Sequence, residues 1–142
     1  MQLTTFTDYG LRTLMFLAAH PDRLCSIREV AGYYDISYNH LVKVAHRLAQ
    51  LGVIVSTKGK GGGIKLAKRA DQLKLGDLVR FLEPSMDVVE CFNRDSNTCR
   101  ITDSCQLKHY LFDAKKDFLA SLNRHTLSDT VKSKKLFSVV NN

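Results

Sequence analysis

Residues 26–67 constrain the fold more than any other part of this 142-residue chain. Ser26-Ile27-Arg28-Glu29 is a capping-box sequence that predicts the start of a helix, and Asp35-Ile36 ends it. Ser37 predicts the start of the next helix and Gly52 its left-handed stop. The apolar face of this second helix consists of Leu41, Val44, Leu48 and Leu51. The two helices form a helix-turn-helix pattern over about 26–52.

A glycine-rich basic loop follows directly, between two β-prone runs. Residues 53–56 and 64–67 have strand composition, and residues 57–63 between them hold four glycines and two lysines. This order of strand, glycine-rich loop and strand predicts a β-hairpin over 53–67. Because the hairpin directly follows a recognition helix, it is expected to be the wing of a winged helix. Its glycines let the backbone approach a phosphate or enter a minor groove. A merely flexible loop is the alternative.

The positive charge is concentrated in the first half of the chain. The net charge is +7, and residues 1–70 carry ten Lys and Arg against four Asp and Glu, whereas residues 71–142 carry eleven against ten. A localised basic patch is typical of proteins that bind a polyanion. Charge alone fits a solvated surface equally well, but its position beside a helix-turn-helix favours DNA.

Composition predicts a cytoplasmic protein that is either one compact domain or a small domain with an appended element. No apolar run approaches the roughly 18 residues of a membrane span. Asp8 and Arg12 interrupt the apolar N-terminal stretch and argue against a signal peptide. Four cysteines without a secretion signal indicate reduced thiols.

The remaining helices give a mainly α fold. A first helix is expected from about Thr4 to Ala19, ending before Pro21, and a short one from Leu75 to Glu83, closed by Pro84. The expected units are a winged helix-turn-helix domain over 1–84, a loop over 85–103, a long helix over 104–125 and a loosely held tail over 126–142.

The long helix is expected to be capped by Thr102 or Asp103 and to run to about Leu122. Its apolar residues are spaced 4, 3, 4 and 4, close to a coiled-coil seam: Leu107, Leu111, Ala114, Phe118 and Leu122. The spacing favours a dimerisation helix, because helix-turn-helix proteins commonly read two half-sites. Packing against its own domain is the alternative.

Three cysteines, Cys91, Cys99 and Cys105, are spaced C-x7-C-x5-C. Thiolates on a loop are ligands that soft metal centres prefer, whereas the paired C-x2-C knuckles typical of zinc are missing. From spacing alone, a metal site, a redox disulfide and no function all stay open. Cys25 is distant in sequence and is expected to be a small buried hydrophobe.

Three sulfurs leave a metal centre one ligand short, because iron–sulfur clusters and structural zinc usually take four protein ligands. An oxygen, a nitrogen or an exogenous molecule must then complete the site. The candidates are Asp8, Asp103 and His109.

Several motifs together carry a family resemblance. They are Met1-Gln2-Leu3-Thr4, Phe6-Thr7-Asp8-Tyr9-Gly10-Leu11-Arg12, Ser37-x-Asn39-His40-Leu41-x-Lys43 and Lys58-Gly59-x-x-Gly62-Gly63-Ile64. With them the chain resembles the iron–sulfur winged-helix regulators over essentially its whole length, and within this family the nitric-oxide-sensitive repressors.

The resemblance implies a homodimer that represses nitrosative-stress defence genes and releases DNA when nitric oxide nitrosylates its cluster. It implies one iron–sulfur cluster per subunit, either 2Fe–2S or 4Fe–4S, bound by Cys91, Cys99 and Cys105, with Asp8 of the partner subunit as candidate fourth ligand. Two positions depart from the pattern. The interval from Cys91 to Cys99 is longer than in many relatives, and Lys108 stands where one branch has a histidine.

The predicted DNA contacts lie at the start of the recognition helix, in the wing and in the helix before them: Arg28, Ser37, Tyr38, Asn39, His40, Lys43, Lys58, Lys60, Gly61, Gly62 and Lys65. An asparagine can pair bidentately with adenine in the major groove. The sequence has no C-x-x-C motif and no general base beside a cysteine, so nothing in it indicates an enzyme. The alternatives are a regulator of another regulon, a zinc or disulfide winged-helix factor, and a redox protein.

Overall fold

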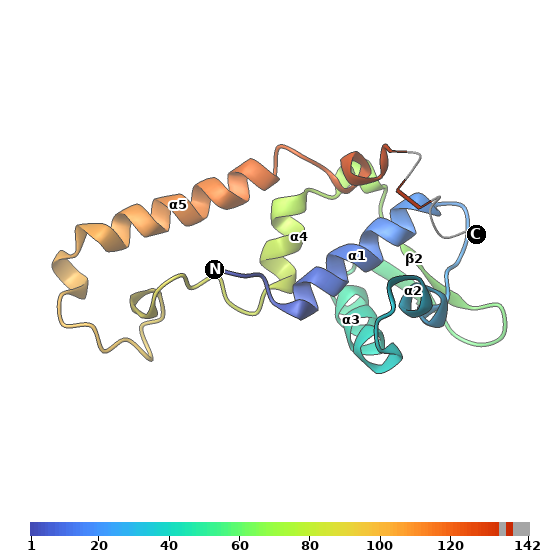
Figure 1. The fold of residues 1–142 in the computed structure, drawn as a ribbon, viewed down its shortest axis with the longest axis horizontal. Coiled ribbons are helices and arrows are strands. Elements are labelled where there is room, and N and C mark those ends of the chain that lie inside the picture. Colours follow the sequence, from blue (N-terminus) through green and yellow to red (C-terminus); the bar gives the residue numbers. More distant parts are fainter. Residues whose placement is uncertain (134–135, 138–142) are drawn as a thin grey trace.

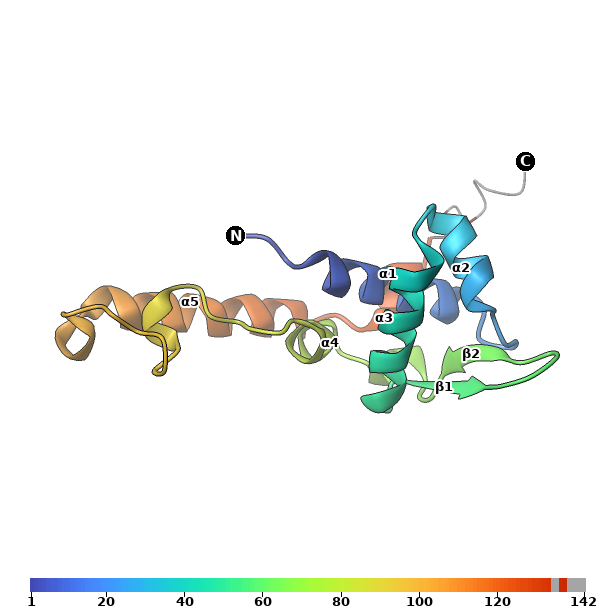
Figure 2. The same ribbon diagram turned by 90° about the horizontal axis from the view of Figure 1, so that it is seen from below.

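The computed structural model describes residues 1–133 and 136–137. Its helices and strands are α1 (Thr5–Ala19), α2 (Ile27–Tyr34), α3 (Tyr38–Gln50), β1 (Ile54–Thr57), β2 (Gly63–Leu66), α4 (Leu75–Leu82) and α5 (Gln106–Leu122), with short 3-10 turns between them. Helices α1 to α3 and the hairpin gather at one end of the molecule, and α5 extends away from them (Figures 1 and 2). Within the described ranges no helix is long and apolar enough to cross a membrane.

The core lies where α1 crosses α3, α4 and the hairpin. Leu14 and Leu17 of α1 are 0% and 1% exposed, and Leu48 of α3 is also fully buried. Ile64 of β2 closes the core from the wing side at 2% exposure. Burying side chains of this size contributes about 1.5–3 kcal/mol each, so this junction fixes the position of the recognition helix.

The helix-turn-helix forms as predicted, but only half of the capping box is present. The Ser26 Oγ accepts a hydrogen bond from the Glu29 N–H at 3.0 Å. The Glu29 carboxylate does not reach back to Ser26; it pairs with both Nη atoms of Arg23 at 2.6 and 3.0 Å. A guanidinium offers two charge-assisted hydrogen bonds, whereas the Ser26 amide offers one neutral bond.

The predicted stop of α3 at Gly52 is confirmed. Gly52 has a φ of 69°, and the Val53 N–H donates to the Leu48 carbonyl at 3.1 Å. This six-to-one bond is a Schellman motif, which needs a residue that adopts the left-handed region without strain. The turn directs the chain straight from α3 into β1.

The wing is an antiparallel hairpin in which Ile54 pairs with Leu66 and Thr57 with Gly63. A third segment joins it, because Cys25 and Ile64 exchange backbone hydrogen bonds of 2.9 and 2.8 Å. The wing is therefore tied to the loop that precedes α2. Together these elements confirm the predicted winged helix-turn-helix.

Helix α4 is attached at both ends by side-chain hydrogen bonds. At its start, Asn123, the C-cap residue of α5, accepts from the Asp77 N–H and donates to the Asp77 carboxylate, each at 3.0 Å. At its end, the Glu83 carboxylate accepts from the Thr7 hydroxyl at 2.6 Å and from the Thr4 N–H at 3.1 Å. Helix α4 thus connects α5 to the beginning of α1.

The final helix begins later than the sequence predicts. Neither Thr102 nor Asp103 caps it, because residues 102–104 form a separate 3-10 turn. The Thr102 hydroxyl donates to the Cys99 carbonyl at 2.8 Å, which occupies it within the loop. Helix α5 starts at Gln106, so Cys105 is its N-cap residue.

The expectation of a loosely held tail from Thr126 is wrong for residues 126–131. They form a 3-10 turn with a capping box between Thr126 and Asp129. Leu127 is fully buried, and its N–H donates to the Leu73 carbonyl at 2.8 Å. One apolar residue in a polar stretch fills the core beside α1. Residues 134–135 and 138–142 of the expected tail lie outside the described residues.

Candidate nucleic-acid interface and cysteine segment

The first two turns of α3 present a polar surface to solvent. Its buried residues, Leu41, Val44, Ala45 and Leu48, face α1 and α2. The residues predicted to contact DNA lie on the other side and are all exposed: Ser37, Tyr38, Asn39, His40 and Lys43. The periodicity that buries one face of α3 therefore leaves its polar start accessible to a groove.

Arg28 belongs to the same surface although it comes from α2. Its guanidinium carbon lies 4.7 Å from the centroid of the Tyr38 ring, within the range of a cation–π contact. Nearby, the Arg23 guanidinium lowers the pKa of the Glu29 carboxyl through their hydrogen bonds. Glu29 is thus held as the partner of Arg23.

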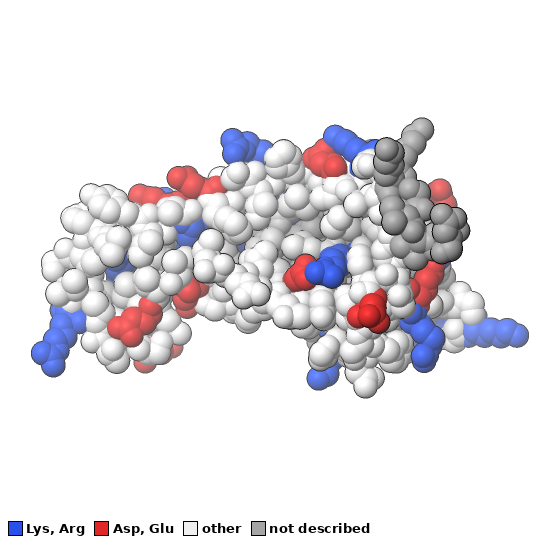
Figure 3. Space-filling model, viewed as in Figure 1, with Lys and Arg blue, Asp and Glu red and all other residues white. Residues whose placement is uncertain are grey.

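The wing carries the other predicted contacts. Lys58, Lys60, Gly61 and Lys65 are exposed, and Gly62 is half-buried. The loop closes through a hydrogen bond of 3.0 Å from the Gly62 N–H to the Gly59 carbonyl. Basic side chains project at the hairpin end of the molecule, and side chains of both charges are scattered over the rest of this face (Figure 3).

The three clustered cysteines lie on a segment that is organised mainly by its own hydrogen bonds. Asn97 is central, because its Oδ1 accepts from the Cys99 N–H at 3.0 Å and its Nδ2 donates to the Thr102 hydroxyl at 2.8 Å. Cys91 lies in a 3-10 turn of residues 90–92, and next to it the Phe92 ring packs edge-on against Phe112 of α5.

Cys91, Cys99 and Cys105 are free, half-buried thiols, which matches the donor chemistry of a thiophilic iron centre. Their positions in one chain do not complete such a centre. Among residues 1–133 and 136–137, no three side chains of His, Cys, Asp or Glu gather closely enough to hold a metal ion. The segment therefore has the type of ligand that an iron centre needs, but its three thiols would have to come closer together to bind one.

The three other candidate ligands are either held in an ion pair or exposed. Asp8 forms an ion pair with Arg12 on α1, with 2.7 Å between Oδ2 and Nη2. Asp103 and His109 are exposed. Cys25 is fully buried, as predicted, and burial raises the pKa of its thiol.

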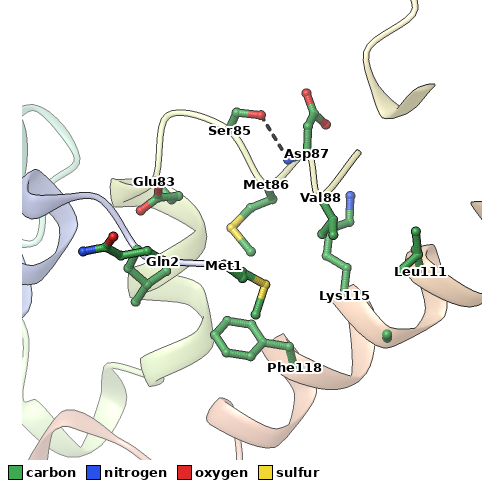
Figure 4. Close-up of a pocket in the computed structure, with 12 residues that line it drawn as sticks. Met1, Gln2, Glu83, Ser85, Met86, Asp87, Val88, Leu111, Lys115 and Phe118 are labelled. Atoms are coloured by element: carbon green, nitrogen blue, oxygen red, sulfur yellow. Dashed lines mark hydrogen bonds between the residues drawn. The ribbon is translucent and has the colours of Figure 1, made fainter. Parts of the chain in front are cut away.

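An apolar cavity of about 460 Å³ separates the N-terminal residues from α5 (Figure 4). Met1, Met86 and Phe118 point into it, and Lys115 lies along its edge. Leu111, Ala114 and Phe118 of the predicted seam line its helical wall. Large apolar side chains at the start of α5 are also exposed, with Leu107 at 62% and Tyr110 at 64%.

Two contacts that connect the cysteine segment to the recognition helix through α1 are not predicted from the sequence. Glu83, just before the segment, accepts a hydrogen bond from Thr7 of α1. The ring centroids of Tyr9 in α1 and His40 in α3 lie 6.4 Å apart. No local pattern signals either contact, because the Thr7–Glu83 bond spans 76 residues. Only Thr4-x-x-Thr7 hints that the start of α1 uses hydroxyl groups.

Comparisons with known proteins agree with this arrangement. The family described as "Rrf2: Iron-dependent Transcriptional regulator" matches residues 3–133. The HTH-type transcriptional regulator NsrR of Shouchella clausii (strain KSM-K16) is 46% identical over 132 residues, covering 92% of this chain and 89% of that protein. The regulator of the same name from Bacillus subtilis (strain 168) is 46% identical over 135 residues, covering 94% and 92%. Among solved structures, T. potens IscR superposes with a TM-score of 0.74 at 25% identity, covering 93% and 87%.

Proposed function

The chain belongs to the Rrf2 family of iron-dependent transcriptional regulators, and we propose that it is a cytoplasmic DNA-binding repressor that responds to nitric oxide. The observation that carries this proposal is the 46% identity to regulators named NsrR over nine-tenths of the chain. The exposed start of α3 beside a basic wing and three free thiols are the two parts that such a regulator needs.

DNA is read by the start of α3, which enters the major groove. Asn39 is the residue suited to pair bidentately with a base edge, and His40 and Lys43 lie one to four positions further along the same surface. The wing holds the backbone through Lys58, Lys60 and Lys65, with Gly61 and Gly62 allowing close approach. Contacts of the wing type add affinity for any sequence, and those of α3 add specificity.

The signal is received at the cysteine segment. Cys91, Cys99 and Cys105 hold one iron–sulfur cluster per subunit, and Asp8 of the partner subunit is the candidate fourth ligand. When bound, the cluster supplies iron that reacts with nitric oxide. Binding by Asp8 requires release of its ion pair with Arg12, which is exposed and therefore costs no more than about 1 kcal/mol.

Two subunits associate through α5. In one chain this 17-residue helix has no buried residue, although it carries the apolar seam and the exposed Leu107 and Tyr110. A helix with such a face is stabilised by a partner that covers it. A two-fold dimer also presents two recognition helices to two half-sites.

The test uses anaerobically purified full-length protein and a duplex selected by it from random sequences. We expect coloured protein that binds the duplex, loses the complex on addition of nitric oxide, and binds about 10³–10⁵-fold more weakly at 200 mM than at 50 mM salt if a dimer contacts 6–10 phosphates. Cys99→Ala protein should be colourless and still folded.

Colourless, zinc-loaded wild-type protein, or a thiol switch that operates without iron, would contradict the iron–sulfur proposal. A nearly flat salt dependence would contradict binding through phosphate contacts. Retained colour in the Cys99→Ala protein would remove Cys99 from the ligands.

A further inference from the structure

Arg28 and Tyr38 form a stacked pair across the two helices of the helix-turn-helix. Arg28 is the second residue of α2 and Tyr38 is the first residue of α3. The guanidinium carbon of Arg28 lies over the Tyr38 ring, 4.7 Å from its centroid. Both side chains are exposed, with Tyr38 at 42%. The pair therefore lies on the surface that contains Asn39 and His40.

The charge of Arg28 is not neutralised. In the part of the chain that the structure describes, Arg28 takes part in none of the ion pairs, whereas neighbouring Arg23 is paired with Glu29 at 2.6 Å. The first turn of a helix is also an unfavourable place for a cation, because the macrodipole is positive there. Neither an ion pair nor the helix dipole therefore explains this placement.

The Tyr38 ring limits the freedom of a side chain that would otherwise be mobile. A long arginine loses rotamer entropy when it binds a partner, and an existing contact that holds the guanidinium reduces this loss. The Arg28 guanidinium lies over the ring of Tyr38, and the Tyr38 hydroxyl makes no hydrogen bond to another described residue.

We propose that Tyr38 is a positioning residue and that it holds the Arg28 guanidinium for binding to a DNA phosphate beside the groove that α3 enters. This inference rests on the proposed DNA-binding function and assigns different roles to adjacent residues. Tyr38 contributes through Arg28 to affinity for any sequence, whereas Asn39 contributes to the choice of sequence. Arginine is suited to this role because its planar group both stacks on a ring and binds phosphate.

A double-mutant cycle tests this assignment. Dissociation constants are measured over about 50–200 mM salt, for the selected duplex and for a duplex of random sequence. The proteins are the wild type, Arg28→Gln, Tyr38→Leu, the double variant and two controls. Tyr38→Phe keeps the ring, and Arg23→Gln removes an arginine whose charge is already paired.

The Arg28→Gln protein should bind both duplexes roughly tenfold or more weakly, because a charged hydrogen bond to phosphate is lost. The slope of log K against log salt concentration should become shallower by about 0.9 per subunit, the value for one phosphate contact. Tyr38→Leu should weaken binding of both duplexes about 2–5-fold per subunit, the worth of an exposed cation–π contact. Adding Tyr38→Leu to Arg28→Gln should have no further effect, and Tyr38→Phe should match the wild type.

Additive losses in the double variant would show that Tyr38 contacts DNA independently and would overturn the proposal. A loss in Arg23→Gln equal to that in Arg28→Gln would also overturn it, since any arginine on this surface would then suffice. A wild-type protein that binds no duplex would contradict the proposed function itself. Unfolding curves that match the wild type show that each variant is folded.

Discussion

The Glu83 carboxylate lies where the end of α4 meets the start of α1, directly before the cysteine segment. It accepts hydrogen bonds from the Thr4 N–H and from the Thr4 and Thr7 hydroxyls at 3.1, 3.2 and 2.6 Å. Thr7 is fully buried. One half-buried side chain thus accepts hydrogen bonds from the buried Thr7 hydroxyl and from the N-cap residue Thr4, and it fixes the helix that carries Asp8.

We expect Glu83→Ala to lower the free energy of unfolding by about 1–3 kcal/mol, because it removes the carboxylate that accepts the hydrogen bond of the buried Thr7 hydroxyl. Urea unfolding followed by circular dichroism measures the change. Asp87→Ala is the control, since Asp87 is an exposed acid four residues further along the same chain segment. Equal midpoints for the two variants would mean that the Glu83 contacts contribute nothing.

At the scale of the elements, the contact between α4 and α5 depends on a glycine. A Cβ atom at Gly76 would lie 2.4 Å from the Leu119 carbonyl oxygen and 2.6 Å from the Asn123 Oδ1. The carbonyl belongs to the α5 backbone and cannot move independently of its helix. Gly76 therefore sets how closely the base of α5 approaches α4.

Gly76→Ala should destabilise the protein by about 1–3 kcal/mol, because the added methyl group forces the two helices apart. Gly32→Ala is the matched control, since Gly32 is also helical and has no atom within 4 Å of an added Cβ. At that exposed position alanine should stabilise the helix by about 0.5–1 kcal/mol. Both changes are measured as free energies of unfolding, and a Gly76→Ala protein as stable as the wild type would show that the helices can separate freely.

The same elements show what the sequence could predict. Local signals were sufficient where a structure closes within a few residues, as at Ser26, at Gly52 and in the glycine-rich wing. They failed where a distant group competed, as when Arg23 took the Glu29 carboxylate and when the Thr102 hydroxyl bonded within its loop rather than capping α5. For the site, residue types gave the candidate ligands and DNA contacts, but stacking of Arg28 on Tyr38 and closure by Glu83 depend on tertiary packing.

The whole molecule is elongated, with α1 to α3 and the hairpin at one end and α5 extending to the other (Figure 2). The first end contains the core against which α3 packs, and the second contains the cysteine segment and then α5, which has no buried residue in a single chain. A helix of this length extends about 25 Å at 1.5 Å per residue, so its outer part is distant from the core. In the proposed dimer, the second copy of the chain stabilises this outer part of α5.

Leu107→Glu is expected to convert the dimer into a monomer, because Leu107 is 62% exposed in one chain and a charge in a buried apolar seam is costly. The folded head should survive, since no core residue is changed. Sedimentation equilibrium gives the molecular mass, and titration with the selected duplex should show affinity reduced by a factor on the order of 10²–10⁴ as the second half-site contact is lost. Lys116→Glu, a charge change at another exposed position of α5, should leave the dimer intact. A Leu107→Glu protein that still sedimented as a dimer would exclude this seam as the interface and, with it, the delivery of Asp8 to the partner subunit by this route.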